Sequence, residues 1–487
     1  MEIYVVQPGD TLYRIAQRYG TTVAALQSVN QLPNPDRLVI GQAILIPSPP
    51  LEPLRYTVQP GDTLYQLALL FNTTVSQIAQ ANQIINPNQI AVGTTLLIPG
   101  WSQFNYQVQP GDTLSLIAGR YGISVAMIAK VNQIANPALI YPGQILRIPQ
   151  ITPTKPNIEV LAYIMASDIS GMEQSLPQIG SLLTYGVVFQ FPVDATGAIT
   201  VPDNTARAVS VLKQYNVQPS PAVTNWGANG FDSDLARSII GNDTVKTRTI
   251  NNILTILNQF GFAGVNIDFE NMYPDDRTLF NNFIRDLVAA LKPQGYSVSV
   301  AVPAKFSDQP SAAWVGTFDY ATLGQLADFI FLMTYEWGWI GGPPMAIAPI
   351  NLVRRALTYA TSLIPPAKIL QGIPLYGYNW PIPQSPDRPA VPVNLVEVYD
   401  LALRYGVNIN YDSQSQAPWF RYTDEQGQQH EVWFEDARSI TAKYTATRDF
   451  NLRGVGYWSY WGNPYGFPQN WVILNDMFRV VKIPAGS

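Results

Sequence analysis

"GVNIDFEN", residues 264–271, places two carboxylates and an amide in a stretch that is otherwise apolar. Along a β-strand, successive side chains point to opposite faces. One face then carries the apolar side chains Val265, Ile267 and Phe269. The other face carries the polar side chains Asn266, Asp268 and Glu270. Such a strand fits a β/α barrel, because the apolar face packs on outer helices while the polar face points inward and ends at the mouth.

The chain from Asn157 onward repeats this alternation of strand-like runs with amphipathic, helix-like stretches. We expect eight strands, at residues 159–165, 182–191, 218–225, 263–270, 296–304, 328–337, 369–378 and 453–461. Residues 247–261 and 276–295 are examples of the helical stretches between them. Eight β/α units predict a (β/α)8 TIM barrel over residues 156–487.

One insertion interrupts this pattern after the seventh strand. Residues from about 380 to 433 have the composition of a small α+β lobe, and the next helical pattern starts near Glu435. We therefore expect the lobe between strand 7 and helix 7 of the barrel.

The first 150 residues contain three repeats that align without a gap. They begin "YVVQPGDTL", "YTVQPGDTL" and "YQVQPGDTL", at Tyr4, Tyr56 and Tyr106. In each repeat an Asn follows the Asp by 20 residues and a Pro follows it by 37. Such strict repetition predicts three copies of one unit, at residues 2–48, 54–100 and 104–150. "GWSQF", residues 100–104, reads as a short linker between the second and third copies.

One repeat predicts strand, helix, helix, strand. Asp10 is expected as the N-cap of a first helix whose apolar residues Leu12, Ile15, Ala16 and Tyr19 have helical spacing. Thr21 or Thr22 can cap a second helix, and residues 43–47, "AILIP", form the closing strand.

These βααβ repeats resemble the LysM module, whose signature "PGDTL" they carry. The resemblance implies binding of N-acetylglucosamine polymers between the loop after the first strand and the loop before the last. The residues implied are Gly9, Asp10, Thr11, Leu12, Gly61, Asp62, Thr63, Leu64, Gly111, Asp112, Thr113 and Leu114. For single positions a structural role is an open alternative: a helix cap for Asp10, a turn for Gly9, a helix end for Asn30. Three weak sites in a row favour avidity on a polymer.

Composition excludes several classes of function. Net charge is −5 and there is no Lys/Arg cluster, so binding of nucleic acid is not expected. There is no cysteine, and the single histidine, His430, lies in a polar turn entering a strand, where we expect an exposed bystander. Carboxylates are the main candidates for proton transfer. The N-terminus shows no secretory signal, and no run of about 18 apolar residues predicts a membrane span.

Asp268 and Glu270 lie roughly 7 Å apart at their Cα atoms if both are in one strand. Both then approach a bound sugar from the same side, whereas an ordinary retaining glycosidase needs its nucleophile on the opposite side. The 2-acetamido group of the substrate is the alternative nucleophile. Two carboxylates in a partly buried site also raise the pKa of one of them, as a general acid requires.

The chain from about residue 157 resembles glycoside hydrolase family 18. "AGVNIDFE" is similar to the signature of the family, "MTYEW" (333–337) to its Met-x-Tyr element and "GVGYW" to its eighth-strand Trp. The resemblance implies that Glu270 is general acid and then base, that Asp268 orients the acetamido group, that Tyr335 binds its carbonyl oxygen and that Trp458 lies under the sugar. Ala263 and Asn266 replace two acidic residues of the signature, so the acidic relay below Asp268 is shortened. Asn266 is counted with the catalytic set.

Further residues are candidates for binding substrate. Met333 belongs to the matched element, and Tyr376 lies at a strand end. Glu336 either binds substrate or pairs with an Arg of the barrel. Four tryptophans serve either as sugar platforms or as packing: Trp337, Trp339, Trp380 and Trp461.

The combination of repeats and barrel resembles the spore cortex-lytic and germination branch of the family. It implies a retaining, substrate-assisted N-acetylglucosaminidase for peptidoglycan, which needs no metal or cofactor. A chitinase, or a silent barrel that only binds glycan, are the alternatives. We expect a monomer that is made in the mother cell and reaches the spore from inside it.

Overall fold

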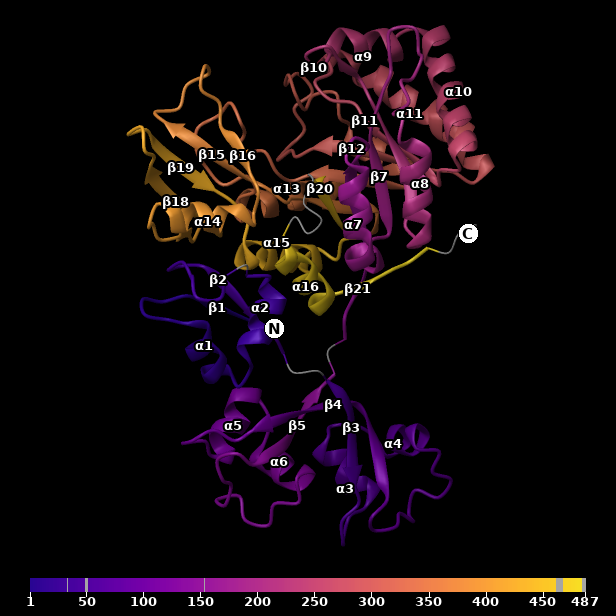
Figure 1. The fold of residues 1–487 in the computed structure, drawn as a ribbon. Coiled ribbons are helices and arrows are strands. Elements are labelled where there is room, and N and C mark those ends of the chain that lie inside the picture. The colour runs from indigo at the N-terminus through magenta and orange to yellow at the C-terminus, as the bar shows by residue number, and fades with distance from the viewer. Residues whose placement is uncertain (33, 49–50, 153, 461–466, 484–487) are drawn as a thin grey trace. The chain divides into compact units, whose positions relative to one another are not determined.

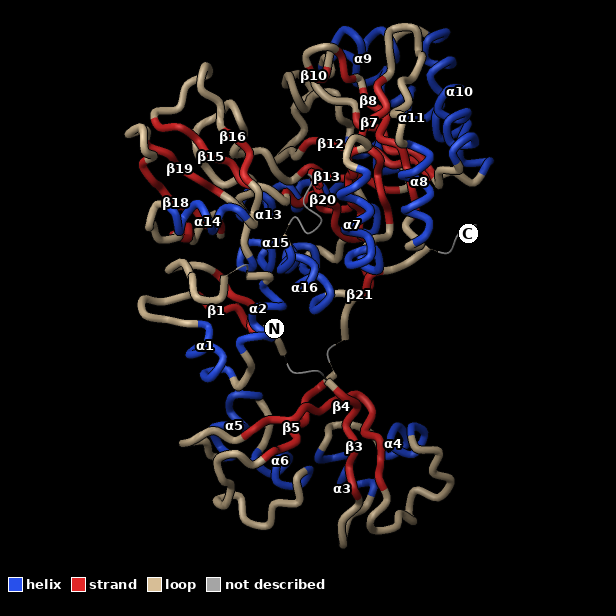
Figure 2. The backbone as a smooth tube through the Cα atoms, viewed as in Figure 1, coloured by secondary structure: helices blue, strands red, loops and turns tan. Residues whose placement is uncertain are grey.

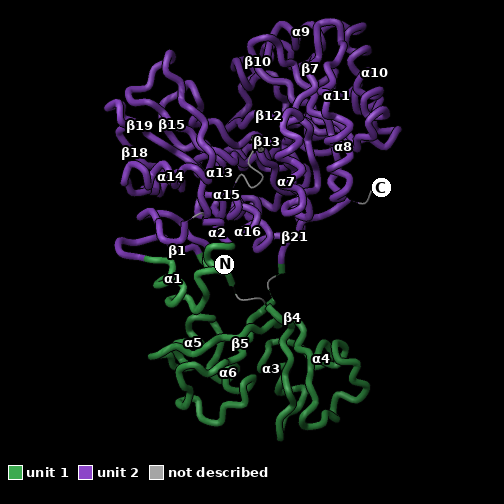
Figure 3. Tube along the Cα trace, viewed as in Figure 1, with its two compact units in different colours: residues 1–2, 11–28, 46–154 green, residues 3–10, 29–45, 155–487 purple. Residues whose placement is uncertain are grey.

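The computed structural model describes residues 1–487 except 33, 49–50, 153, 461–466 and 484–487. The described chain forms two compact units, which Figure 3 colours separately. The first contains residues 1–2, 11–28 and 46–154. The second contains residues 3–10, 29–45 and 155–487. Each is described by itself below.

A closed barrel of eight parallel strands dominates the second unit (Figure 1), which confirms the predicted TIM barrel. The strands are, in order around the barrel, β6 (Asn157–Met165), β7 (Tyr185–Pro192), β8 (Gln218–Thr224), β11 (Gly264–Asp268), β12 (Ser297–Pro303), β13 (Phe329–Met333), β14 (Ile369–Pro374) and β20 (Gly454–Tyr460). The barrel closes where β20 pairs with β6, with Gly454 opposite Glu159. The short strand β21 (Arg479–Val480) pairs with the other edge of β6.

Helices cover the outside of the barrel (Figure 2). They are α7 (Ile169–Ile179), α8 (Thr205–Gln214), α9 (Ser233–Ile240), α10 (Asp243–Phe260), α11 (Arg277–Leu291), α12 (Tyr320–Leu326), α13 (Ile350–Leu363), α15 (Ala437–Asp449) and α16 (Pro468–Met477). The longest, α10, begins where the Asn242 side chain accepts hydrogen bonds from two backbone N–H groups and ends at Gly261 with φ +68°.

The side chains of β11 alternate as the sequence predicts. Val265, Ile267 and Phe269 are buried in the core between strands and helices. Asn266 and Asp268 point into the barrel and are also buried. The regular strand ends at Asp268, so Glu270 lies just beyond it, at the carboxyl end of the barrel.

The insertion after β14 is the predicted α+β lobe, and it precedes α15. Its antiparallel sheet has the strand order β16-β15-β19-β18-β17. The elements are β15 (Gly377–Ile382), β16 (Val391–Val393), α14 (Glu397–Arg404), β17 (Asn410–Asp412), β18 (Ala417–Thr423) and β19 (Gln429–Trp433). A second small insertion, the two-residue strands β9 (Trp226–Gly227) and β10 (Gly230–Phe231), follows β8.

The second and third repeats form one continuous sheet in the first unit. Their elements are β3 (Glu52–Thr57), α3 (Leu64–Leu70), α4 (Val75–Ala81), β4 (Thr95–Gln107), α5 (Leu114–Tyr121), α6 (Val125–Val131) and β5 (Ile145–Ile151). The strand β4 closes the second repeat and opens the third, with β3 and β5 antiparallel on its two sides. The expected linker at residues 100–104 is therefore wrong, since the segment continues the strand through the buried Trp101 and Phe104.

The first repeat has the same elements, β1 (Glu2–Val5), α1 (Leu12–Tyr19), α2 (Val23–Asn30) and β2 (Ala43–Ile46), with β1 paired to β2. The prediction that Asp10 caps α1 is wrong. The N-cap is Thr11, whose extended backbone lets its side chain accept from the N–H of Arg14. Asp10 instead accepts from the Tyr4 hydroxyl at 2.5 Å and the Gln7 N–H at 2.7 Å, which fixes the turn.

Asn30 has the structural role that was the alternative to sugar binding. It ends α2, and its side-chain amide forms two hydrogen bonds with the backbone of Leu45, at 2.9 and 2.7 Å. The equivalent residues Asn82 and Asn132 bond the backbone of the last strand in the same way.

Among the described residues, no single helix has both the length and the apolar character needed to cross a bilayer. The pair α5 and α6, bent by 106°, meets that test only when its two helices are taken together.

Candidate active site

A cavity of about 660 Å³ opens at the carboxyl ends of the barrel strands. It brings together most of the residues predicted for the site. Its lining consists of Tyr163, Phe231, Asp268, Glu270, Pro303, Ala304, Trp314, Phe331, Met333, Tyr335, Glu336, Trp337, Trp339, Tyr378 and Trp458.

Glu270 is held in place through its backbone by Asn225, the residue that follows β8. The Asn225 side chain accepts from the Glu270 N–H and donates to the Glu270 carbonyl oxygen, both at 2.9 Å. The same side chain donates to the carbonyl oxygen of Asp232. Asn225 is fully buried, so this clamp is isolated from water. Sequence reasoning missed Asn225, because nothing in its local pattern indicates a partner 45 residues away.

Two carboxyl groups share the floor of the cavity. Asp268 is 4% exposed, and burial raises its pKa to about 7. Burial, together with the charges of Asp268 and Glu336, raises the pKa of Glu270 well above its ordinary value. The Asp268 Oδ1 atom has no hydrogen-bond partner within the part of the chain that the structure describes. The arrangement thus favours a protonated Glu270 at neutral pH, beside a buried carboxyl oxygen that lacks a partner among the described residues.

Asn266 lies deeper in the barrel and is not part of the cavity lining. Its Oδ1 accepts from the Tyr163 hydroxyl at 2.8 Å, and its Nδ2 donates to Ser299 Oγ at 3.0 Å. Where the family signature has an acid, this chain therefore has a neutral, hydrogen-bonded amide. Asn266 supports the floor of the site and has no contact with the cavity.

Tyr335 lies two residues beyond the end of β13, in the cavity wall. Burial, followed by the neighbouring acidic groups, raises its pKa well above the ordinary value, so the hydroxyl stays a proton donor. Gly372 of β14 is needed behind it, because a Cβ there would lie 2.7 Å from the ring. Met333, the last residue of β13, also lines the cavity.

Glu336 lines the cavity next to Tyr335 and has a left-handed backbone, with φ +64°. Its Oε1 accepts from the Tyr378 hydroxyl at 2.9 Å and from the Tyr376 hydroxyl. The alternative of pairing with an Arg of the barrel is therefore wrong. Burial raises the pKa of Glu336, although both hydroxyls oppose that shift. Tyr376 itself is buried outside the lining and acts through Glu336.

Some of the candidate tryptophans line the cavity, and one is packed in the protein core. Trp458 lines the cavity and packs nearly perpendicular to Tyr163 and Phe189. Trp337 and Trp339 also line it, and Trp339 is 50% exposed. Trp380 is fully buried and donates to the Gly342 carbonyl oxygen, so it packs the core and is no sugar platform. Trp461 lies outside the described residues.

Five aromatic residues of the cavity were not predicted, namely Tyr163, Phe231, Trp314, Phe331 and Tyr378. Trp314 is 62% exposed, and Phe231 belongs to the small β9–β10 insertion. Trp314 lies in a turn and Phe231 in a two-residue strand, where no periodicity points to a binding role.

His430 lies in the lobe and is not the exposed residue that was expected. It is partly buried, stacks on Tyr422 and bonds Asn379 and Asp424 at 3.1 and 3.2 Å. It does not line the barrel cavity. Across the described ranges, no group of three or more His, Asp or Glu side chains is placed to hold a metal ion.

The second repeat has a groove of about 580 Å³ between the two loops that the LysM resemblance implies. Asp62, Thr63 and Leu64 line one side with the 65% exposed Tyr65, and residues 87–91 line the other.

Within each repeat the predicted residues also have structural roles. Thr11, Thr63 and Thr113 are N-caps, Leu12, Leu64 and Leu114 are buried, and Gly9, Gly61 and Gly111 have φ of +81° to +87°. Asp112 accepts from the Tyr106 hydroxyl and the Gln109 N–H, as Asp10 does from their equivalents.

Known proteins match the whole chain. Residues 162–461 match glycosyl hydrolases family 18, and residues 4–47, 56–99 and 106–149 match the LysM domain. The chain is 43% identical over 431 residues to the cortical fragment-lytic enzyme of Bacillus subtilis (strain 168), covering 88% of this chain and 98% of that one. It is 32% identical to the putative sporulation-specific glycosylase YdhD of the same organism, covering 99% and 100%. The crystal structure of the Bacillus cereus spore cortex-lytic enzyme SleL matches with a TM-score of 0.73 and 34% identity, over 99% of each chain. The chain therefore belongs to glycosyl hydrolase family 18 and carries three LysM domains.

Proposed function

We propose that this protein hydrolyses spore cortex peptidoglycan, cutting the β-1,4 bond that follows N-acetylglucosamine. The observation that carries the proposal is the pair Asp268 and Glu270 on one side of the cavity, with Tyr335 in the wall. The third acid of the lining, Glu336, has its Oε1 occupied by two tyrosine hydroxyls. This leaves the acetamido group of the substrate as the nucleophile that the arrangement supports best.

In the proposed mechanism, Glu270 donates its proton to the glycosidic oxygen, and the bond from that oxygen to C1 breaks. The acetamido carbonyl oxygen attacks C1 and forms an oxazolinium ion, whose N–H donates to Asp268. The Tyr335 hydroxyl donates to the same carbonyl oxygen and holds it under C1. The Glu270 carboxylate then takes a proton from water, which attacks C1 and reopens the ring, so the configuration is retained and Glu270 regains its proton.

The relatives indicate the biological setting. They are named for cortical fragments, for sporulation and for the spore cortex. We propose that the protein acts as a monomer on the spore, after synthesis in the mother cell, and that the LysM domains hold it on the glycan.

Mass spectrometry of the products released from purified spore cortex, vegetative peptidoglycan and chitin tests the proposal. Fragments that end in reducing N-acetylglucosamine are expected from cortex. They should be absent with Glu270→Gln and unchanged with Glu173→Gln, which alters a partly exposed acid on α7 that pairs with Arg207. Products from chitin alone would favour a chitinase. No product from any polymer, with binding to cortex retained, would favour a silent barrel, the alternative motivated by the amide at Asn266.

A further inference from the structure

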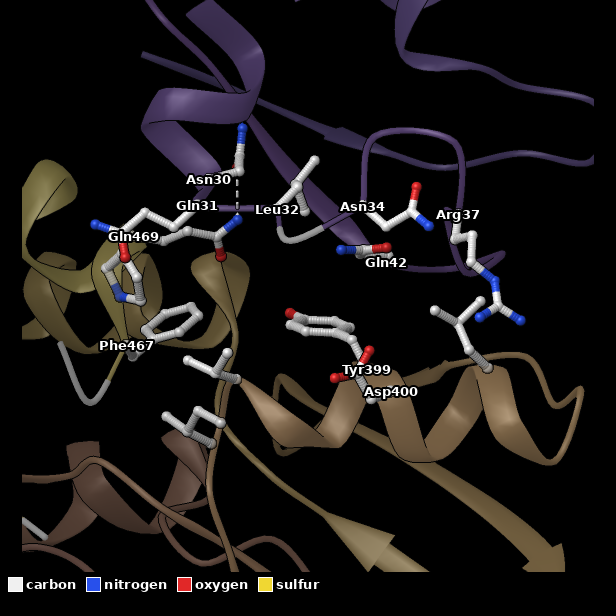
Figure 4. A pocket seen from close by; sticks show the side chains of 14 residues that line it. Asn30, Gln31, Leu32, Asn34, Arg37, Gln42, Tyr399, Asp400, Phe467 and Gln469 are labelled. Carbon is white, nitrogen blue, oxygen red and sulfur yellow. Dashed lines mark hydrogen bonds between the residues drawn. The ribbon is translucent and has the colours of Figure 1, made fainter. Parts of the chain in front are cut away.

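A second cavity, of about 170 Å³, lies in the barrel-containing unit, away from the mouth of the barrel. Asn34, Arg37 and Gln42 line it from the loop between α2 and β2 of the first repeat. Tyr399 and Asp400 of α14 and Gln469 of α16 line it from the lobe and the barrel. Figure 4 shows the Tyr399 ring facing the first-repeat loop across this space.

Two residues that line this cavity each have a buried polar atom without a partner in the described part of the chain. Gln469 is 3% exposed, and its Nε2 donates to Asn30 Oδ1 at 2.6 Å and to the Ala43 carbonyl oxygen at 3.0 Å. Its Oε1 has no hydrogen-bond partner among the described residues, and neither has the Tyr399 hydroxyl. Buried polar groups are normally paired, so an unpaired acceptor and an unpaired hydroxyl on two residues that line one cavity point to a ligand with N–H or O–H groups.

The remaining lining suits a neutral ring with one apolar face. Leu395, Leu403 and Phe467 supply apolar walls. Arg37 and Asp400 are exposed and of opposite charge, so the site has no net charge that would select an ion. A cavity of about 150 Å³ is large enough for a benzene ring, which places a six-membered sugar ring within reach of this one.

This cavity is not the groove of the LysM repeats. The first and second repeats correspond with an offset of 52 residues, so the groove loop 87–91 of the second repeat corresponds to residues 35–39 of the first. Of those five positions only Arg37 lines the second cavity, whose other first-repeat residues lie at 30–34 and at Gln42. The loop between α2 and β2 therefore faces α14 and α16 with residues other than those that correspond to the LysM groove.

We propose that this cavity binds one N-acetylated hexosamine of a glycan, as a carbohydrate site separate from both the catalytic cavity and the LysM grooves. The amide N–H or a hydroxyl of the sugar donates to Gln469 Oε1, and another hydroxyl pairs with Tyr399. The acetamido methyl packs on the apolar wall. The choice of an N-acetylated sugar rests on the proposed function, whereas the presence of a site for a neutral ring does not.

Photo-crosslinking to the full-length protein tests the site directly. The probe is a glucosamine whose N-acyl group carries a diazirine, and labelled peptides are located by mass spectrometry. Label is expected on peptides containing residues 395–403 or 467–469, and excess N-acetylglucosamine should compete it away. Tyr399→Phe, which removes only the hydroxyl, should lower this label several-fold. Tyr405→Phe is the matched control, because that hydroxyl bonds Glu425 outside the cavity and the label should not change.

Label confined to the barrel mouth or to residues 87–91 would overturn the proposal, as would equal labelling of the wild type and Tyr399→Phe. Competition by glucose equal to that by N-acetylglucosamine would overturn the assignment of an N-acetylated sugar. The proposed hydrolase function is read separately, from products released from cortex, so either proposal can fail while the other stands.

Discussion

At the scale of single residues, the same burial that suits Glu270 to its proposed role as the acid opposes its ionisation and so costs stability. A buried acid whose pKa is raised in the folded state binds its proton more tightly there than in the unfolded chain, where Glu titrates near pH ~4.3. Between those two pKa values the folded state holds more protons, so stability falls as the pH rises.

We therefore expect Glu270→Gln to inactivate the enzyme and also to stabilise it. At pH 7 the Tm should rise by about 2–4 °C, because an amide carries no ionisation penalty. The gain should shrink towards pH 4, where both states of the wild type are protonated. Calorimetry at pH 4, 7 and 8 measures this, with Glu173→Gln as a surface control that shifts Tm by less than about 1 °C. A Tm gain that does not depend on pH would contradict the argument.

Asn225 gives a second prediction at this scale. Asn225→Ala removes both hydrogen bonds to the backbone of Glu270 without touching its carboxyl group. A small displacement of a catalytic group costs on the order of 100-fold in rate, so kcat should fall by about that factor with little change in KM. The pH profile should also shift, because the setting of Glu270 changes. Asn252→Ala is the control: Asn252 lies on the outer helix α10 and donates to the Gly197 carbonyl oxygen, so its loss should leave kcat at the wild-type value.

These residues show how far the sequence reaches. Glu270 and Asp268 were predictable, because acidic residues at alternate positions of an otherwise apolar strand are unusual and the motif around them is specific. Asn225 was not, since its role exists only once β8 and β11 lie side by side. Asp10 was misassigned because Asp and Thr are both good N-caps, and sequence alone does not show which of two neighbours has the capping backbone.

At the scale of elements, the alternation of side chains predicted the strands, but it did not predict how one repeat is joined to the next. One such joint is β4, which links the second and third repeats, and side chains reinforce it. Lys130 of α6 pairs with Asp62 of the second repeat at 2.8 Å, and Gln59 donates to the Lys130 carbonyl oxygen at 2.7 Å. The side chain of Asp62 is only 4% exposed. Burial would raise its pKa, but hydrogen bonds from Lys130 and Tyr56 lower it.

Lys130→Met should loosen the groove loop of the second repeat, because it leaves a buried carboxylate without its cation. We expect a loss of about 1–3 kcal/mol in the local stability of residues 59–64, read from hydrogen exchange in the full-length protein. A carboxylate with a lowered pKa stabilises the fold above its unfolded pKa of ~3.9 and loses that effect as the pH falls. The difference between variant and wild type should therefore be full at pH 7 and shrink below pH ~4.

Arg120→Met is the matched control for that experiment. Arg120 approaches Asp112 within the third repeat at 3.6 Å and is half exposed, so its loss should have a smaller effect. Equal protection of residues 59–64 in Lys130→Met and the wild type would show that the ion pair contributes nothing to the joint.

At the scale of the whole molecule, the compact units do not follow the repeats. Residues 29–45 cluster with the barrel, and Val39, Ala43 and Leu45 are buried in its core. The third repeat has Tyr141, Ile145 and Arg147 at these positions, the first two of them more than half exposed. The sequence could not show which surface Val39, Ala43 and Leu45 pack against, because that depends on the folded barrel.

If the LysM grooves only bind glycan and the barrel only hydrolyses it, variants of the two sites should have different effects. Tyr65→Ala removes an exposed aromatic ring from the groove of the second repeat, and Trp314→Ala removes one from the catalytic cavity. Because linked weak sites act through effective concentration, Tyr65→Ala should weaken retention on cortex and slow its digestion by up to about 10-fold. It should leave kcat/KM on a short soluble oligosaccharide unchanged. Trp314→Ala should lower kcat/KM on both substrates, since its ring lines the cavity that holds Asp268 and Glu270. A drop on the soluble substrate with Tyr65→Ala would mean that the repeats take part in catalysis itself, and the separation of binding from chemistry would fail.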